Sequence, residues 1–362
     1  MGFDLGPTEE QLALRETLHS FANDVVRPAG RAAESARTTG ADIAREIHGI
    51  GVSAPVSEDY GGGGVLDAVT YCMAAEELSW GNPGIAWSIF GSGLAAILLG
   101  IAGSEEQKRR YLPQFCAADP VPSFVAIGEK VAAGDLEALE TTVAGGVVTG
   151  EKYGVLNAEE APFGVVVGRG PHGLVAGMVE AESYETLAPE DKMGLEAAPT
   201  SVVRFDGACE ELAPGPDLVR AVLWAKLATG AVALGCARAS LEYASNYATE
   251  REAFGKPIGA FQGVSFKIAD MAIIVDSARA ALWRAAWMLD RGEATPHDIA
   301  EANGQALTAA IQCGDEGVQV LGGHGYIQDH PVEMWFRDAV TLSVFDAPDL
   351  LGDLTVARSI VA

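Results

Sequence analysis

Basic residues are scarce in this sequence. Its 362 residues include 24 lysines and arginines against 50 aspartates and glutamates, which gives a formal net charge of −26 at pH 7. A surface of this sign repels polyanions, so nucleic acids and anionic membranes are disfavoured as partners. A polyanionic cofactor would have to bind through locally placed arginines, helix N-termini or glycine-rich backbone.

Paired cysteines, a signal peptide and a long apolar run are also lacking. The five cysteines are scattered without a C-x-x-C pair, so no metal site is expected and the thiols are interpreted as reduced, in a cytoplasmic protein. The N-terminal sequence MGFDLGPTEEQ has neither the basic nor the apolar region of a secretory signal. No run of about 18 apolar residues is free of glycine and charge, so no transmembrane span is expected.

The residues that are present divide the chain into three blocks. Residues 1–120 are helical in pattern, residues 121–213 hold short β-rich runs broken by glycine, asparagine and proline, and residues 214–362 return to helix. The middle block predicts a small antiparallel sheet or barrel. The last block predicts an up-down bundle with helices over 216 to about 254, about 263–291, and 295 to the glycine pair at 322–323. The expected fold is mostly α with a central β domain.

Helix-start signals and an apolar stripe support this division. Thr8 and Ser104 each precede a glutamine at the third helical position, which predicts two capping boxes, and Thr295 precedes a proline at a helix start. In residues 270–289, one face collects apolar side chains typical of a bundle core. They are Met271, Ile274, Val275, Ala278, Ala281, Leu282, Ala285 and Leu289.

The stretch REAFGKPIGAFQ, residues 251–262, is the most specific in the chain. Arg251 can form charge-assisted hydrogen bonds to a phosphate, and Phe254 offers a flat apolar surface. Gln262 opens the next helix, where backbone donors also attract anions. The alternative is a plain turn between two helices that carries a surface arginine.

The stretch QVLGGHGY, residues 319–326, is the second candidate for chemistry. Gly322 and Gly323 permit close backbone approach or a positive φ, and Gln319 can hydrogen-bond an amide or phosphate edge. The alternative is that the glycine pair only ends a helix.

Together the two stretches resemble the acyl-CoA dehydrogenase family, flavoenzymes that desaturate acyl thioesters. SEDYGGGG near the N-terminus and the helix–β–helix order extend the resemblance over the whole chain. It implies an N-terminal helical domain (1–120), a middle β-barrel domain (121–213) and a C-terminal four-helix bundle (214–362). It also implies FAD at a subunit interface in an oligomer, usually a tetramer. The residues matching those that reach the neighbouring subunit's FAD are Arg251, Phe254, Gln262, Gln319, Gly322 and Gly323.

The sequence also departs from the family pattern. GEKVAAGD stands where the family has T-E-P-x-A-G-S-D, so Gly128 and Gly134 replace hydroxyl residues. KYGVLNA stands for K-x-W-I-[ST]-N-A, which places Gly154 at the tryptophan and Leu156 at a hydroxyl position. Each lost hydrogen bond to flavin would cost on the order of 1 kcal/mol. Lys226 stands at a position where the family often has arginine.

Asp346 stands where the family's catalytic glutamate lies in Y-E-G-T. The resemblance gives this carboxylate the role of the base that takes the α proton while the β hydride goes to flavin. Aspartate is shorter by one methylene, and a misplacement of about 1 Å can cost roughly a hundredfold in rate. The alternative is that Asp346 caps the last helix, a role that Asp349 could equally fill. Asp338 is expected to pair with Arg337 or with a neighbouring helix.

Three functions remain open at this point. The first is an FAD-dependent acyl-CoA dehydrogenase that passes electrons to an electron-transfer flavoprotein. The second is a non-catalytic or FAD-sharing subunit of a heteromeric enzyme acting on bulky, sterol-type acyl-CoA esters. The third is a changed reaction on the same scaffold, with a carrier-bound acyl group or as an oxygenase.

Overall fold

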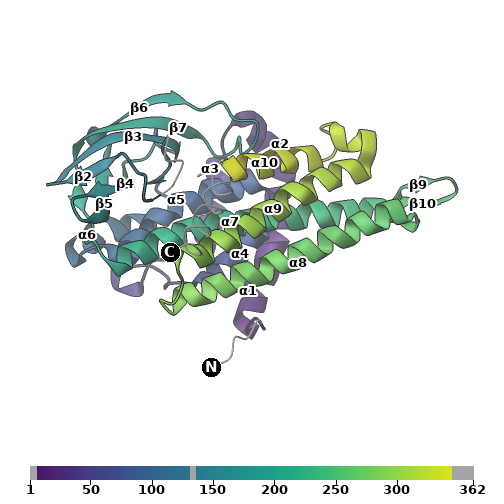
Figure 1. Ribbon diagram of the computed structural model, residues 1–362, viewed down its shortest axis with the longest axis horizontal. Coiled ribbons are helices and arrows are strands. Elements are labelled where there is room, and N and C mark those ends of the chain that lie inside the picture. Colours follow the sequence, from purple (N-terminus) through teal and green to yellow (C-terminus); the bar gives the residue numbers. More distant parts are fainter. Residues whose placement is uncertain (1–5, 131–135, 345–362) are drawn as a thin grey trace.

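The computed structural model describes residues 6–130 and 136–344. Gly134, Asp346 and Asp349 lie outside the described residues. The elements follow the order helices, sheet, helices (Figure 1), so the predicted mostly helical fold with a central β domain is confirmed.

Helices make up the N-terminal part. They are α1 (Glu9–Phe21), η1 (Ala22–Val26), α2 (Arg27–Ala36), α3 (Ala41–Ile50), η2 (Glu58–Tyr60), α4 (Ala68–Gly81), α5 (Pro83–Ala102), α6 (Glu105–Tyr111) and η3 (Leu112–Cys116). Both predicted capping boxes form, at Thr8 and at Ser104. Asn82 ends α4 and caps α5, because its side-chain oxygen accepts a hydrogen bond from the backbone N–H of Ile85.

A sheet of mostly antiparallel pairs follows. Its strands are β1 (Val125–Ala126), β2 (Thr142–Ala144), β3 (Val147–Leu156), β4 (Phe163–Gly170), β5 (Gly173–Glu180), β6 (Tyr184–Pro189), β7 (Thr200–Ala208) and β8 (Glu210–Glu211), with η4 (Ala181–Ser183) between β5 and β6. The strand order is β6-β7-β3-β2-β4-β5-β8, and β1 pairs with β4 in parallel. The β3–β7 register shifts between Lys152 and Val155, so β3 carries an irregularity there.

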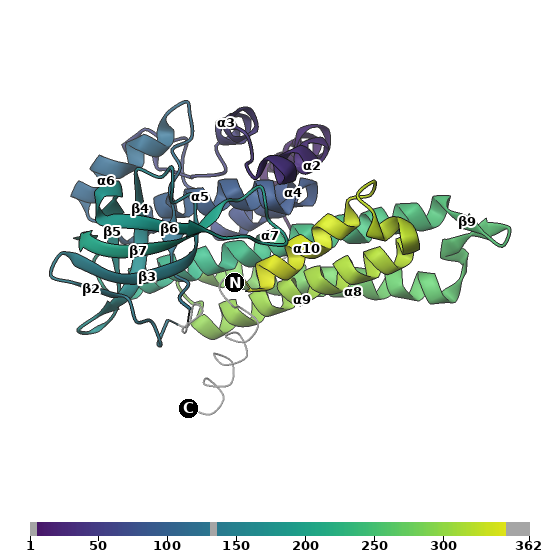
Figure 2. The same ribbon diagram turned by 90° about the horizontal axis from the view of Figure 1, so that it is seen from above.

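Long helices form the last part of the molecule. They are α7 (Pro216–Glu250), α8 (Gln262–Asp290), α9 (Pro296–Leu321) and α10 (Val332–Val344), with β9 (Glu252–Ala253), β10 (Lys256–Pro257) and η5 (Ile258–Ala260) between α7 and α8, and η6 (Gly322–Tyr326) after α9. The β9–β10 hairpin lies at the end of the bundle opposite to the sheet (Figures 1 and 2). The helix predicted to reach about residue 254 ends at Glu250, because the backbone of Arg251 is extended and Phe254 has a φ of 53°.

The predicted apolar stripe of α8 faces the bundle core. Met271, Val275, Leu282 and Leu289 are buried, as are Ala278 and Ala285, while Ile274 and Ala281 are partly covered. Full burial of a leucine-sized side chain stabilises a fold by about 1.5–3 kcal/mol, so this stripe fixes the rotation of α8 about its axis.

Two helices among the described residues, α5 and α7, are apolar and long enough to cross a membrane by length and composition. However, 83% of the apolar 18-residue stretch in each helix is buried inside the protein. Their apolar side chains therefore supply the core shared by the N-terminal helices and the bundle.

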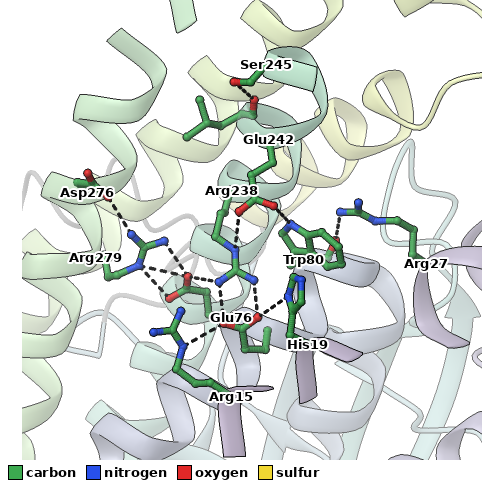
Figure 3. Close-up of polar contacts among 12 residues, drawn as sticks. Arg15, His19, Arg27, Glu76, Trp80, Arg238, Glu242, Ser245, Asp276 and Arg279 are labelled. Atoms are coloured by element: carbon green, nitrogen blue, oxygen red, sulfur yellow. Dashed lines mark hydrogen bonds and ion pairs between the residues drawn. The ribbon is translucent and has the colours of Figure 1, made fainter. Parts of the chain in front are cut away.

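Buried charges join the N-terminal helices to the bundle (Figure 3). Arg238 of α7 donates to Glu77 at 2.7 Å and to Glu76 at 3.0 Å, and Arg279 of α8 donates to Glu76 at 2.9 Å. Burial alone would raise the pKa of Glu77, but the hydrogen bonds and charges of Arg238 and Arg15 outweigh burial and lower it. Since both glutamates are satisfied, this cluster fixes α1, α4, α7 and α8 relative to one another.

Candidate functional site

A cavity of about 670 Å³, the central cavity, lies between the sheet and the helices. The sheet side contributes Val125, Ile127, Gly128, Tyr153, Gly154 and Leu156. The helices contribute Trp87, Gly91 and Leu94 of α5, Ala225 and Thr229 of α7, and Val340, Thr341 and Val344 of α10. This volume and its largely apolar walls are typical of a small-molecule or cofactor site.

The sheet wall of the central cavity carries small and apolar residues. Gly154 lies at the β3 irregularity with a φ of 67°, and its N–H donates to the carboxylate of Glu190 at 3.0 Å. Leu156 packs so close to Gly91 that a Cβ at residue 91 would lie 2.7 Å from its Cδ2. At positions 128, 154 and 156, therefore, the wall presents backbone groups and methyl groups to a ligand but no side-chain hydroxyl.

A buried ion pair forms part of this wall, because Glu129 lines the cavity. Lys152 is fully buried and donates to Glu129 at 2.7 Å and to the carbonyl of Ile127 at 2.8 Å. Glu129 also accepts the backbone N–H groups of Glu140 and Thr141. Burial acts to raise the pKa of Glu129, but these donors outweigh burial and lower it, so the carboxylate is held ionised beside the cavity.

Helix α10 forms part of the opposite wall and is fixed to the β6–β7 loop. The side chain of Asp338 accepts the backbone N–H of Leu195 at 2.6 Å, and Arg337 donates to the carbonyl of Met193 at 2.6 Å. Gly194 lies against this helix so closely that a Cβ there would be 2.4 Å from the carbonyl oxygen of Arg337. The hydrogen bond of Asp338 thus goes to a loop of the β domain rather than to a neighbouring helix, and burial raises its pKa to about 7.

Asp346, the predicted base, lies outside the described residues, and its role stays a prediction. The last described residue of α10, Val344, lines the central cavity, and Asp346 follows it by two residues in the sequence.

Arg251, Gly322 and Gly323 come together at the far end of the bundle. They line a second cavity of about 530 Å³, the distal cavity, with Tyr247, Ile258 and His324 among its other walls. Gly322 has a φ of 59° and its N–H donates to the carbonyl of Gln319, so this glycine does cap α9 as well as lining the cavity.

The remaining predicted residues flank the distal cavity without lining it. Gln262 is the first residue of α8 and Gln319 lies in the last turn of α9, and both are exposed. Phe254 is 97% exposed at the tip of the β9–β10 hairpin, and its ring centroid lies 6.2 Å from that of Phe261. All six predicted dinucleotide residues therefore lie at the bundle end that faces away from the central cavity (Figure 1).

Arg251 differs from the other arginines within residues 6–130 and 136–344. It alone among them makes no side-chain hydrogen bond, ion pair or cation–π contact inside this part of the chain. An unpaired guanidinium on a strongly acidic protein is available to an anion from outside the protomer.

Sequence reasoning missed two groups of residues. Trp87, Gly91 and Leu94 lie on one face of α5, and their spacing of four and three was a usable signal for a shared wall. His324 and Tyr247 line the distal cavity, and their closeness to Gly323 and Arg251 in the sequence was the only available signal.

A lateral cavity of about 650 Å³ lies on the other side of α5, between α3 and the β6–β7 loop. It shares Glu190 and Lys192 with the central cavity. Its arginines are already paired within the protein, Arg37 with Asp191 and Arg45 with Asp119.

Comparisons with known proteins agree with this architecture. The acyl-CoA dehydrogenase N-terminal domain matches residues 8–119, and the C-terminal domain matches residues 218–360. An acyl-CoA dehydrogenase of Bacillus subtilis (strain 168) is 31% identical over 97% of this chain and 98% of its own. A benzylmalonyl-CoA dehydrogenase of Aromatoleum aromaticum is 31% identical over 99% of this chain and 100% of its own.

The structure of butyryl-CoA dehydrogenase from Megasphaera elsdenii superposes with a TM-score of 0.88 at 24% identity, covering 99% of this chain and 100% of that one. That likeness supports the fold. The architecture and the sequence matches together define a class, the flavoprotein oxidoreductases with a β domain between two helical parts. The chain belongs to the acyl-CoA dehydrogenase family.

Proposed function

We propose that this protein is an FAD-dependent acyl-CoA dehydrogenase that introduces an α,β double bond into an acyl thioester in the cytoplasm. Its domains would be residues 1–120, 121–213 and 214–362. It would work as a homo- or hetero-oligomer and pass electrons to an electron-transfer flavoprotein.

The observation that carries this proposal is the separation of two complementary surfaces on one protomer. The central cavity lies beside the sheet, whereas Arg251, Gly322 and Gly323 lie at the opposite end of the bundle. A dinucleotide that used both surfaces would have to join two copies, its ring in one central cavity and its nucleotide end on the other copy's distal cavity.

The residues present fit FAD in this arrangement. The apolar walls formed by Ile127, Leu156 and Val340 suit a flat ring, and the unpaired Arg251 suits a pyrophosphate. When bound, FAD supplies an acceptor for the hydride that leaves the β carbon.

The chain itself must supply a base and must exclude water. We assign the base to Asp346, whose carboxylate would take the α proton as the double bond forms. Trp87 and Leu94 would cover the acyl group, and their burial keeps water from the reacting carbons.

One feature of the cavity favours a second candidate, a non-catalytic or FAD-sharing subunit of a heteromeric acyl-CoA dehydrogenase acting on a bulky, sterol-type ester. Gly128, Gly154 and Leu156 present no hydroxyl to a flavin ring at this wall. A chain with this wall would hold its own flavin weakly and still offer Arg251 to the flavin of a sibling chain.

The flavin content of the isolated chain separates the two candidates. We expect the purified protein to carry near-stoichiometric FAD. We also expect that adding butyryl-CoA, or a longer acyl-CoA, will bleach the flavin absorbance under anaerobic conditions. Colourless protein that gains flavin only when co-expressed with a sibling chain would support the second candidate instead.

Substitution of the predicted base tests the catalytic assignment. Asp346→Asn should lower turnover by at least about a hundredfold with FAD content unchanged, because general-base catalysis contributes about 10²–10⁴-fold. Asp349→Asn serves as the matched control and should retain activity. Equal activity of wild type and Asp346→Asn would rule out Asp346 as the base.

A further inference from the structure

The central cavity is lined by one carboxylate, that of Glu190, which the sequence motifs do not contain. Glu190 follows β6 directly, and its carboxylate accepts the N–H of Gly154 at 3.0 Å. Its own backbone N–H donates to the carbonyl of Thr200 at 2.9 Å. Because both its backbone and its side chain are hydrogen-bonded, the carboxylate of Glu190 is held at the sheet wall of the cavity.

The irregularity of β3 makes this contact possible. The β3–β7 register shifts between Lys152 and Val155, so the N–H of Gly154 leaves the ladder and is available to a side chain. Gly154 has a φ of 67°, in the left-handed region that favours glycine. This glycine therefore serves as the donor that holds Glu190 against the cavity.

Two other carboxylates among the described residues line the central cavity, and both are paired with cations. Glu129 pairs with Lys152 at 2.7 Å, and Asp191 pairs with Arg37 at 2.9 Å. Glu190, in contrast, makes no ion pair with any residue that the structure describes. Its negative charge is therefore not cancelled by a direct partner.

Two lysines also line the central cavity. The ammonium of Lys192 donates to the carbonyl of Ala198 at 3.1 Å and to the hydroxyl of Thr200 at 3.2 Å. Lys130 is exposed, so water and salt screen its charge. Among the described residues of this wall, Glu190 is thus the carboxylate whose charge is left to act on a bound ligand.

We propose that Glu190 lowers the reduction potential of the flavin that occupies the central cavity. The inference rests on the proposed FAD site and adds a role for one residue of its wall. A hydride delivered to the flavin ring brings one negative charge with it, and a carboxylate beside the same apolar cavity raises the energy of that charge. The reduced cofactor is then a stronger electron donor toward its acceptor.

The test measures the midpoint reduction potential of the flavin in full-chain protein loaded with FAD, anaerobically and against an indicator dye. Glu190→Gln retains an oxygen that can accept the Gly154 N–H but removes the charge. We expect this substitution to favour the reduced flavin by about tenfold, which for a two-electron couple is a rise of about 30 mV. Lys192→Gln removes a cation from the same loop and should shift the potential in the opposite direction.

Glu182→Gln supplies a matched control, because Glu182 is an exposed glutamate of η4 that lines none of the three cavities described above. It should keep the wild-type potential, since it changes the total charge equally but far from the cavity wall. The inference is overturned if Glu190→Gln does not raise the potential, if Glu182→Gln raises it equally, or if Lys192→Gln shifts it in the same direction. Failure of the wild type itself to bind FAD would instead overturn the proposed function.

Discussion

At the scale of single residues, Asp338 carries the clearest consequence of burial. The residue is 3% exposed, and burial raises the pKa of its carboxyl group from 3.8 to about 7, although the Leu195 N–H and the charge of Arg337 act to lower it. A folded-state pKa above the unfolded value means that the folded protein holds this proton more tightly. The stabilising contribution is then fully present below about pH 4 and is lost as the pH rises through about 7.

We therefore expect the free energy of unfolding to fall less steeply with pH in Asp338→Asn than in wild type between pH 5 and 7. The asparagine oxygen can still accept the Leu195 N–H but cannot ionise, so the difference in slope should approach about 1 kcal/mol per pH unit. Urea unfolding at several pH values measures it.

Two further variants make this result specific. Asp206→Asn changes an exposed aspartate of β7 and should keep the wild-type slope. Burial also raises the pKa of Asp290, to about 6, so this residue too makes the free energy of unfolding fall as the pH rises. It titrates in every variant, so its contribution cancels in the comparison. Parallel curves for wild type and Asp338→Asn would contradict the assignment.

At the scale of elements, the close packing of α5 against Ser53, in the segment between α3 and η2, depends on one glycine. A Cβ added at Gly93 would lie 1.8 Å from the carbonyl oxygen of Ser53, and backbone cannot yield as a side-chain end can. Gly93→Ala should lower the free energy of unfolding by about 1–3 kcal/mol or more, the usual cost of overpacking. Chemical denaturation of the holoprotein measures it.

The same helix offers a matched control at Gly100, which is exposed and where a Cβ would meet no atom within 4 Å. Gly100→Ala should leave stability unchanged or raise it by up to about 1 kcal/mol, because alanine is the better helix former. A similar effect of the two substitutions would show that the contact with Ser53 is not tight.

Local signals predicted the elements well, because caps and periodicity act within a few residues. Thr8, Ser104 and Thr295 cap helices as their neighbours in the sequence indicate, and the core stripe of α8 follows from its spacing alone. The sequence pattern extends α7 to about residue 254, whereas the helix ends at Glu250, since the extended conformation of Arg251 depends on the hairpin that follows.

The site was less predictable, because its contacts join distant parts of the chain. Asp338 and Leu195 are 143 positions apart, and no local pattern indicates that an aspartate of α10 will hold a loop of the β domain. Arg251 and the glycine pair were predicted through a family resemblance, whereas His324 and Tyr247 required the structure that brings η6 beside α7.

At the scale of the whole molecule, the bundle end that carries the β9–β10 hairpin is the surface on which the proposed oligomer would form. Phe254 is 97% exposed, and with Gly255 it forms the two-residue turn of the β9–β10 hairpin, which requires its φ of 53° and presents its ring to the outside. Phe266 and Ile273 are exposed along α8, which begins at the same end of the bundle. We propose that a second copy covers these groups and Arg251 in the oligomer.

Phe254→Ala tests this arrangement directly. Burying a phenylalanine in a partner is worth about 1.5–3 kcal/mol, so its removal should weaken association by at least about tenfold and lower the FAD content in step. The free energy of unfolding of the dissociated protomer should change little, because Phe254 is 97% exposed within the protomer. Val65→Ala, at another exposed apolar residue, should keep the wild-type mass in sedimentation velocity. If Phe254→Ala keeps both its assembly mass and its flavin content, the tip of the hairpin lies outside the interface. Arg251 would then bind an anion without the help of a second copy.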